Sequence, residues 1–164
     1  MKNFIKKITF IALFIFTILS CSKDDEPVNP GILPTEANVG TFEGNMQVTD
    51  DPQTLLGYVF NTKVAITTIG TTATIKVTGN EGFSREFTGT VNAGSSVSST
   101  IIGLTKQTKP VEKTAGGTVV IINNSLTIDL NLNNDAVVVR RETTTPVFTI
   151  SGKIELIGTS LLKI

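Results

Sequence analysis

A regular alternation of apolar and polar side chains runs along the chain from Val39 onward, and it constrains the fold more than any other feature of the sequence. Residues 126–133 read LTIDLNLN, and residues 148–156 read FTISGKIEL. Successive side chains of a β-strand point to opposite faces, so this pattern is typical of strands with one dry and one wet face. No stretch of this region repeats with the period of a helix, and we therefore expect an all-β domain.

Short polar runs rich in Asn, Asp and Gly separate the alternating segments. Because these residues tolerate positive φ, we expect tight turns at 70–71, 80–82, 123–124 and 133–135, with longer connections at 93–96 and 105–117. The resulting eight to nine strands are joined mainly by hairpins, which favours an antiparallel up-and-down β-barrel. A β-sandwich stays open as the alternative, since the connection at 105–117 is long enough for a Greek-key return.

Two segments, 119–122 and 137–139, are apolar without interruption. Strands that are covered on both faces have this pattern. We therefore expect these two segments to be more deeply buried than the alternating ones.

The first 20 residues have the layout of a secretory signal. The segment from Met1 to Lys7 is short and basic, and residues 8–19 are apolar apart from two threonines. Such a run is too short to cross about 30 Å of hydrocarbon, which takes about 20 residues, but it matches the apolar core of a signal peptide. We expect residues 1–20 to be removed from the mature protein.

The residues that end this segment, Ile18, Leu19, Ser20 and Cys21, resemble the lipobox of bacterial lipoproteins. The resemblance implies cleavage between Ser20 and Cys21, followed by a diacylglycerol and an N-acyl chain such as palmitate on Cys21. Cys21 is the only cysteine of the chain, so a disulfide within the chain is impossible. Two or more acyl chains give stable membrane attachment. An unpaired thiol and an intermolecular disulfide stay open as alternatives.

A short acidic segment follows that cysteine and consists of Ser22, Lys23, Asp24, Asp25 and Glu26. It resembles the export signal that sends lipoproteins of Bacteroidota-type bacteria to the outer face of the outer membrane. The resemblance implies a lipid-anchored protein that faces the cell exterior. A periplasm-facing position, in which this segment is only a solvated tether, is the alternative.

Prolines and a glycine mark residues 21–38 as a flexible linker behind the lipidated cysteine. A coil of this length spans about 20–25 Å r.m.s., which would hold the next domain clear of the lipid headgroups. We thus expect a signal peptide at 1–20, a lipidated cysteine with its linker at 21–38, and one antiparallel β domain at 39–164.

Three short segments of the β domain resemble calycin-like barrel domains found on Bacteroidota lipoproteins. Residues 39–46 (VGTFEGNM) look like the opening strand of that family, residues 83–91 (FSREFTGTV) like an internal strand, and residues 150–154 (ISGKI) like the closing strand. The resemblance implies a lipocalin-like barrel, and it supplies no catalytic residues. The chain has no tryptophan, whereas lipocalins proper usually hold one near the first strand.

Composition excludes several classes of function. Without Lys2, Lys6 and Lys7, which belong to the signal, eleven basic and fourteen acidic residues remain. A weakly acidic domain lacks the clustered cations that nucleic-acid binding needs. The chain has no histidine and one cysteine, which excludes Ser-His-Asp and Cys-His catalytic arrangements and ordinary zinc sites. We predict no catalytic residue, no metal site, and no cofactor beyond the covalent lipid.

Arg85 is the candidate ligand-binding residue. It shares a parity with Phe83 and Phe87 and is expected on the dry face, where an unpaired charge is costly. Either Arg85 lies near the barrel mouth and faces ligand or solvent, or Phe83 precedes the strand proper. We predict a membrane-anchored, non-enzymatic binding or accessory module for a small apolar ligand, a glycan or a protein. A structural or adhesive envelope protein without a small-molecule ligand is the alternative.

Overall fold

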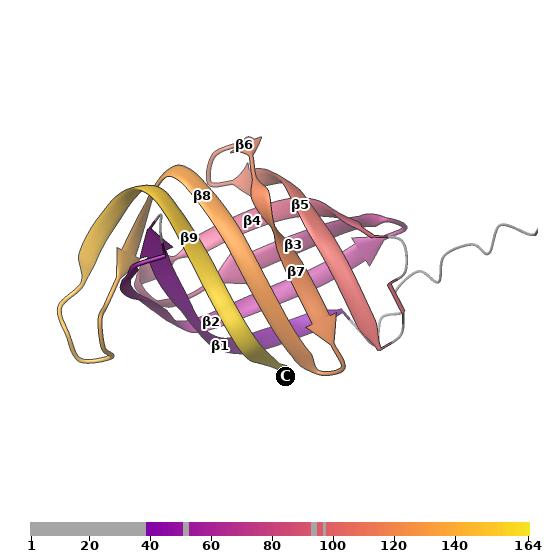
Figure 1. Cartoon of the computed structure of the whole chain (residues 1–164), viewed down its shortest axis with the longest axis horizontal. Helices are drawn as coiled ribbons and strands as arrows, with labels where there is room; N and C mark the ends of the chain where they lie inside the picture. Colours follow the sequence, from indigo (N-terminus) through magenta and orange to yellow (C-terminus); the bar gives the residue numbers. More distant parts are fainter. Residues whose placement is uncertain (1–38, 51–52, 93–94, 97) are drawn as a thin grey trace, which may run out of the picture. The chain divides into compact units, whose positions relative to one another are not determined.

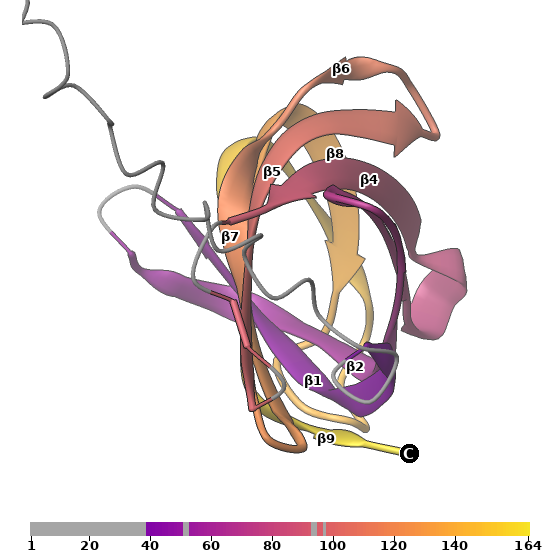
Figure 2. The same ribbon diagram turned by 90° about the vertical axis from the view of Figure 1, so that its right-hand side faces the viewer.

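The computed structural model describes residues 39–50, 53–92, 95–96 and 98–164. These residues form the following elements in chain order: β1 (Gly40–Asp50), β2 (Leu55–Ile69), β3 (Thr72–Thr78), the 3-10 turn η2 (Asn80–Gly82), β4 (Ser84–Val91), β5 (Ser99–Lys109), β6 (Lys113–Thr114), β7 (Gly116–Ile122), β8 (Ser125–Val139) and β9 (Phe148–Lys163). Figures 1 and 2 show these strands wrapped around one central axis.

The strands close into an antiparallel up-and-down barrel. Each of β1 to β5 pairs with the next strand in sequence, β7 follows β5, and β9 returns to pair with β1. The pairing of β4 with β5 completes a ring of eight strands, while the two-residue β6 flanks β5. The predicted barrel of eight to nine strands is therefore confirmed, and the sandwich alternative is wrong because a single closed sheet contains all the strands of the described residues.

The alternation of the sequence places one face of each strand inside the barrel. In β8, Leu126, Ile128 and Leu130 are fully buried, whereas Thr127 between them is exposed. The continuous apolar run 119–122 follows the same rule, since Val119 and Ile121 are buried and Ile122 is 56% exposed. The expectation of deeper burial for this run is wrong, because a barrel wall has one interior face however apolar its outer face is.

Two predicted connections differ in the structure. The predicted turn at 133–135 lies inside β8, where the register shifts between Asn133 and Asp135 and Asn134 takes a φ of 55°. The positive φ that suggested a turn is used for a β-bulge. The predicted connection at 105–117 is shorter than expected, because β5 continues to Lys109 and β7 begins at Gly116.

The barrel has two differently built ends. We call the first the N-terminal rim: it comprises Gly40 with residues 69–72, 92, 95–96, 98–99, 122–125 and 162–164. Backbone hydrogen bonds join its parts, from the Lys163 amide to the Asn124 carbonyl at 3.0 Å and from the Ile164 amide to the Thr41 carbonyl at 2.9 Å. We call the other the hairpin rim: it comprises η2 with residues 110–112 and 140–147.

Candidate functional site

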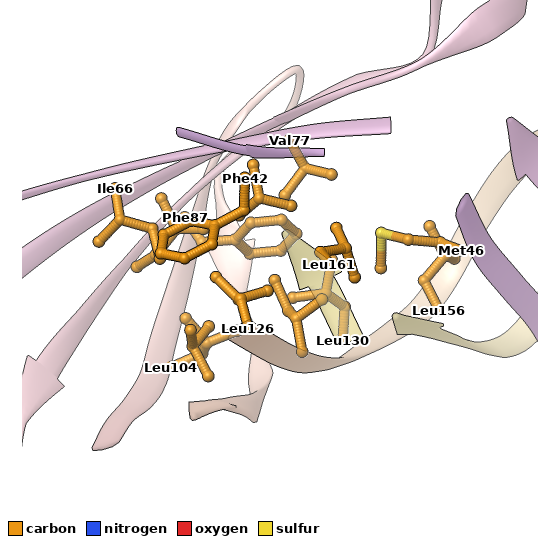
Figure 3. Close-up of a cluster of buried hydrophobic side chains, with 14 of the residues drawn as sticks. Phe42, Met46, Ile66, Val77, Phe87, Leu104, Leu126, Leu130, Leu156 and Leu161 are labelled. Carbon is orange, nitrogen blue, oxygen red and sulfur yellow. The ribbon is translucent and has the colours of Figure 1, made fainter. Parts of the chain in front are cut away.

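Side chains from the strands pack together in the barrel interior. Phe42 and Phe87 lie together at its centre, with Leu126 and Leu130 below them, and all four are fully buried (Figure 3). Met46 and Leu156 continue the same cluster toward the hairpin rim. An eight-stranded barrel has an interior just wide enough for side chains or for one small ligand. In this barrel, aromatic and aliphatic side chains occupy the centre.

A long β8–β9 hairpin folds over the hairpin rim. The last residue of β1 pairs with Ile154, so residues 148–153 of β9 pair only with β8 beyond that point. Directly after β8, Arg140 forms a β-bridge with Tyr58 of β2. The Tyr58 amide donates to the Arg140 carbonyl at 2.8 Å, and the Arg140 amide donates to the Tyr58 carbonyl at 3.1 Å. In Figure 1 the hairpin, in orange and yellow, extends past the ends of the neighbouring strands and curves around that end of the barrel. Its inward side chains Val137 and Val139 are buried.

Arg85 fastens this hairpin from the inside of the barrel. Its Nε donates to Asp135 Oδ2 at 3.0 Å and its Nη2 donates to Asp135 Oδ1 at 3.1 Å, which is the two-point geometry of a strong arginine–carboxylate pair. Nη2 also donates to the Ala136 carbonyl at 2.9 Å, and Nη1 donates to the Ser84 carbonyl at 2.9 Å. The guanidinium lies 4.9 Å from the ring centre of Phe83. Arg85 thus connects β4 to the bulge of β8.

Charge balance around Asp135 favours its ionised form. Burial alone would raise the pKa of Asp135 and is the largest single effect. The hydrogen bonds from Arg85 and from the Ala136 amide, together with the charges of Arg85 and Lys113, outweigh it, so the pKa lies below the usual value. Lys113 Nζ is 3.4 Å from Asp135 Oδ2 and donates to the Asn133 carbonyl at 2.9 Å. The cluster carries two cations around one carboxylate.

A second ion pair holds the outer side of the same hairpin. Arg140 Nη2 lies 2.5 Å from Glu81 Oε1 in η2, and Arg140 Nη1 donates to the Thr145 carbonyl at 2.7 Å. The hairpin rim is therefore fastened at Arg85 on β4, at Tyr58 on β2 and at Glu81 in η2. These contacts stabilise a closed end of the barrel.

The structure places the predicted site residues in two groups. Phe83 precedes β4, which is the second of the two situations that the sequence left open, and Arg85 is buried with Asp135 as its partner rather than facing solvent. A ligand-binding role for Arg85 stays a prediction. The predicted cleavage site at Ser20, the lipidation site at Cys21 and the export segment 22–26 lie outside the described residues. The sequence pattern predicts a turn at Asp135 and gives no indication that this residue is the partner of Arg85.

The outer wall carries a hollow of about 630 Å³ where β1, β2 and the end of β9 meet. Irregular pairing opens it, since β1 shifts register against β2 between Gly44 and Met46 and against β9 after Glu43. The lining residues are Glu43, Gly44, Asn45, Asn61, Lys63, Leu162, Lys163 and Ile164. The Asn61 amide donates to Asn45 Oδ1 at 3.1 Å, and Lys63 Nζ lies 3.9 Å from Glu43 Oε2. Amide, carboxylate and ammonium groups of this kind can hydrogen-bond hydroxyl or peptide groups.

Comparison with known proteins returns no relative of this chain: no family model, no curated protein and no solved structure matches it. Within the described ranges, no group of three His, Cys, Asp or Glu side chains could hold a metal ion. No helix in the same ranges is long and apolar enough to cross a membrane.

Proposed function

We propose that this chain is a lipid-anchored protein of the bacterial outer membrane, held through acylated Cys21 and facing the cell exterior. The support is the order of features in the sequence: a basic start, an apolar run at 8–19, the lipobox-like residues 18–21, and the acidic segment 22–26. A β-barrel that begins directly after a proline-containing linker fits a domain carried on a tether. The resemblance to Bacteroidota-type surface lipoproteins with a calycin-like domain is part of this proposal.

The barrel acts in this proposal as a non-enzymatic binding or accessory module that uses its outer surface. The observation that carries this choice is the filled interior, where Phe42, Phe87 and Leu130 are fully buried against one another. The hairpin fastened by Arg85 and Asp135 also covers one barrel end. A glycan or a protein on the outer wall is therefore favoured over a small apolar ligand inside, and the part of the hollow formed by Asn45 and Asn61 is the candidate contact.

A structural or adhesive role is the second candidate, and the outer face of β2 to β4 favours it. Thr67 pairs with Thr74, and Thr74 pairs with Thr88, which forms a row of outward-facing threonines across three strands. Thr72 and Thr90 form a second pair beside this row. Such regular hydroxyl and methyl groups suit repeated contacts between proteins in an envelope layer.

Labelling with an alkyne analogue of palmitate in the native host tests the anchor. The wild-type chain should incorporate the label and sediment with membranes, while Cys21→Ser should lose the label and keep residues 1–20, because the lipobox thiol is the acceptor. Ser22→Ala is the matched control and should keep the label. A Cys21→Ser protein that still incorporates the label, or a wild-type protein that does not, would contradict the proposal.

Protease treatment of intact cells tests surface display. The wild-type barrel should be digested or detached, while a variant with Asp24→Asn, Asp25→Asn and Glu26→Gln should be protected, because the export segment has lost its charge. Equal protection of both proteins would favour the periplasm-facing alternative. Crosslinking on cells that display the wild-type chain then shows whether a glycan or a protein is bound to the barrel.

A further inference from the structure

We propose that the N-terminal rim of the barrel is a lipid-contacting face, which rests on the headgroup region of the membrane that holds the anchor. This inference rests on the proposed lipid anchor at Cys21 and adds an orientation to it. A flexible tether alone biases the orientation of the domain but does not hold one end of it on the headgroups.

Exposed aliphatic side chains mark this rim. Ile69 at the β2–β3 turn is 87% exposed, Ile122 at the β7–β8 turn is 56% exposed, and Leu162 and Ile164 at the end of β9 are 63% and 62% exposed. The strand order β4-β3-β2-β1-β9-β8-β7-β5 separates these positions around the ring. A membrane surface at this end of the barrel would therefore contact aliphatic side chains on several sides of the ring.

Charge separates this rim from the opposite one. Among the described residues of the N-terminal rim, Lys163 is the only charged side chain, and no side chain is acidic. The turns consist of Gly70 with Thr71 and of Asn123 with Asn124. Small polar turns with aliphatic neighbours can enter the interfacial zone at little cost, and a lysine is compatible with anionic headgroups.

The hairpin rim also has exposed apolar residues, but they stand among charges. Val111 is 65% exposed next to Glu112, and Val147 is 43% exposed close to Arg141 and Glu142. Placing these carboxylates against lipid would cost desolvation and would repel anionic headgroups. The distribution of charge therefore favours the N-terminal rim as the lipid-facing end.

The position of the linker agrees with this orientation. The described chain begins at Val39, and β1 starts at Gly40 on the N-terminal rim. If residues 22–38 behave as the coil that the sequence predicts, they span about 20–25 Å r.m.s., whereas the 11 residues of β1 measure about 35 Å along the strand at the usual rise. The anchor is therefore more often on the side of the N-terminal rim, and tethering raises the local concentration of lipid there.

Single-cysteine labelling of the lipidated chain tests the orientation. The lipid occupies Cys21, so an introduced cysteine is the only free thiol. Thr71→Cys places an environment-sensitive dye on the N-terminal rim, and Thr144→Cys places it in the β8–β9 loop of the hairpin rim. Each labelled protein is reconstituted into phosphatidylethanolamine–phosphatidylglycerol vesicles with a quencher on the acyl chains.

The expected result is several-fold stronger quenching, with a blue-shifted emission, for the dye at position 71 than for the dye at position 144. Replacing Ile69, Ile122 and Leu162 by serine should reduce quenching at position 71 to the level at position 144. The control Val111→Ser with Val147→Ser should leave it unchanged. All of these side chains are on the surface, and circular dichroism checks that the barrel stays folded.

The outcomes separate the inference from the anchor on which it rests. Equal quenching at both positions in protein that floats with the vesicles overturns the inference and keeps the lipid anchor. Quenching at position 71 that appears only after outer-membrane proteins are added to the vesicles also overturns it, because the rim is then a protein-binding face. Protein without the diacylglycerol mass, which does not float, removes the proposed anchor and the inference together.

Discussion

Replacing Arg85 by methionine should release the β8–β9 hairpin from the barrel interior. Methionine keeps much of the aliphatic volume and removes both hydrogen bonds to Asp135, the one to the Ala136 carbonyl and the one to Ser84. Asp135 is then left with Lys113 at 3.4 Å as its only described cation. The question is how much stability this arrangement contributes.

The burial of the pair sets the magnitude. The side chains of Arg85 and Asp135 are 10% and 15% exposed, so water screens their interaction only weakly. Removing one partner of a buried ion pair costs about 3–5 kcal/mol because the other charge stays buried. Lys113 compensates part of that charge, so we expect about 3 kcal/mol for Arg85→Met. The control Lys109→Met breaks a pair with Glu86 whose lysine is 70% exposed, and should cost much less than Arg85→Met because water screens that pair.

Urea unfolding at several pH values measures this effect. The folded-state pKa of Asp135 is lowered, so its contribution is complete above the unfolded pKa of about 3.9 and is lost as the pH falls through the folded pKa. In Arg85→Met, burial still raises the pKa of Asp135, but the arginine that lowers it is gone. The variant therefore lacks the stabilising ion pair that acid removes from the wild type. The difference between wild type and variant should therefore be largest near neutral pH and shrink below about pH 4. Equal stability of the two proteins at pH 7, or a difference that does not change with pH, would refute this account of the hairpin.

Three further predictions concern the barrel wall and its core. Gly117→Ala should cost more than about 3 kcal/mol, because a Cβ there would lie 2.1 Å from the Asp129 carbonyl oxygen at a φ of +134°; Gly152→Ala has a φ of +126° with nothing within 4 Å and should cost less, as thermal unfolding would show. Asp129→Asn should raise Tm at pH 7, because it removes a partly buried carboxylate whose pKa is raised by burial. The gain should vanish at pH 3, where the carboxyl group is protonated, and an equal gain at both pH values would count against a charge effect. Phe42→Ala should cost about 3–5 kcal/mol in urea because the ring is fully buried, and a loss below 1 kcal/mol would mean that the interior is not packed as described.

The alternation of side chains predicted the fold well because a barrel has one dry face throughout. The two-residue period needs no knowledge of which strands pair, and the turns at 70–71 and 123–124 lie where Gly and Asn indicated them. The same chemistry was misleading at 133–135, where Asn134 uses a positive φ for a bulge inside β8. A local preference for positive φ does not distinguish a turn from a bulge, because both use it.

The environment of Arg85 could be predicted only in part. The parity of Arg85 indicated an inward charge that needs a partner. The partner, Asp135, lies 50 residues away on a strand that neither follows nor precedes β4, so no local pattern connects the two. The closing bridge from Arg140 to Tyr58 likewise depends on how the β8–β9 hairpin curves over the barrel end. Such contacts follow from tertiary packing, which the period of the sequence does not encode.

The lipid anchor can be read from the intact mass of the protein extracted from the membranes of its native host. We expect a chain that begins at Cys21, whose N-terminal residue carries a diacylglycerol and an additional acyl chain, with fragment ions that place the whole added mass on that residue. A chain that starts at Met1, or one whose Cys21 carries no lipid, would contradict this expectation.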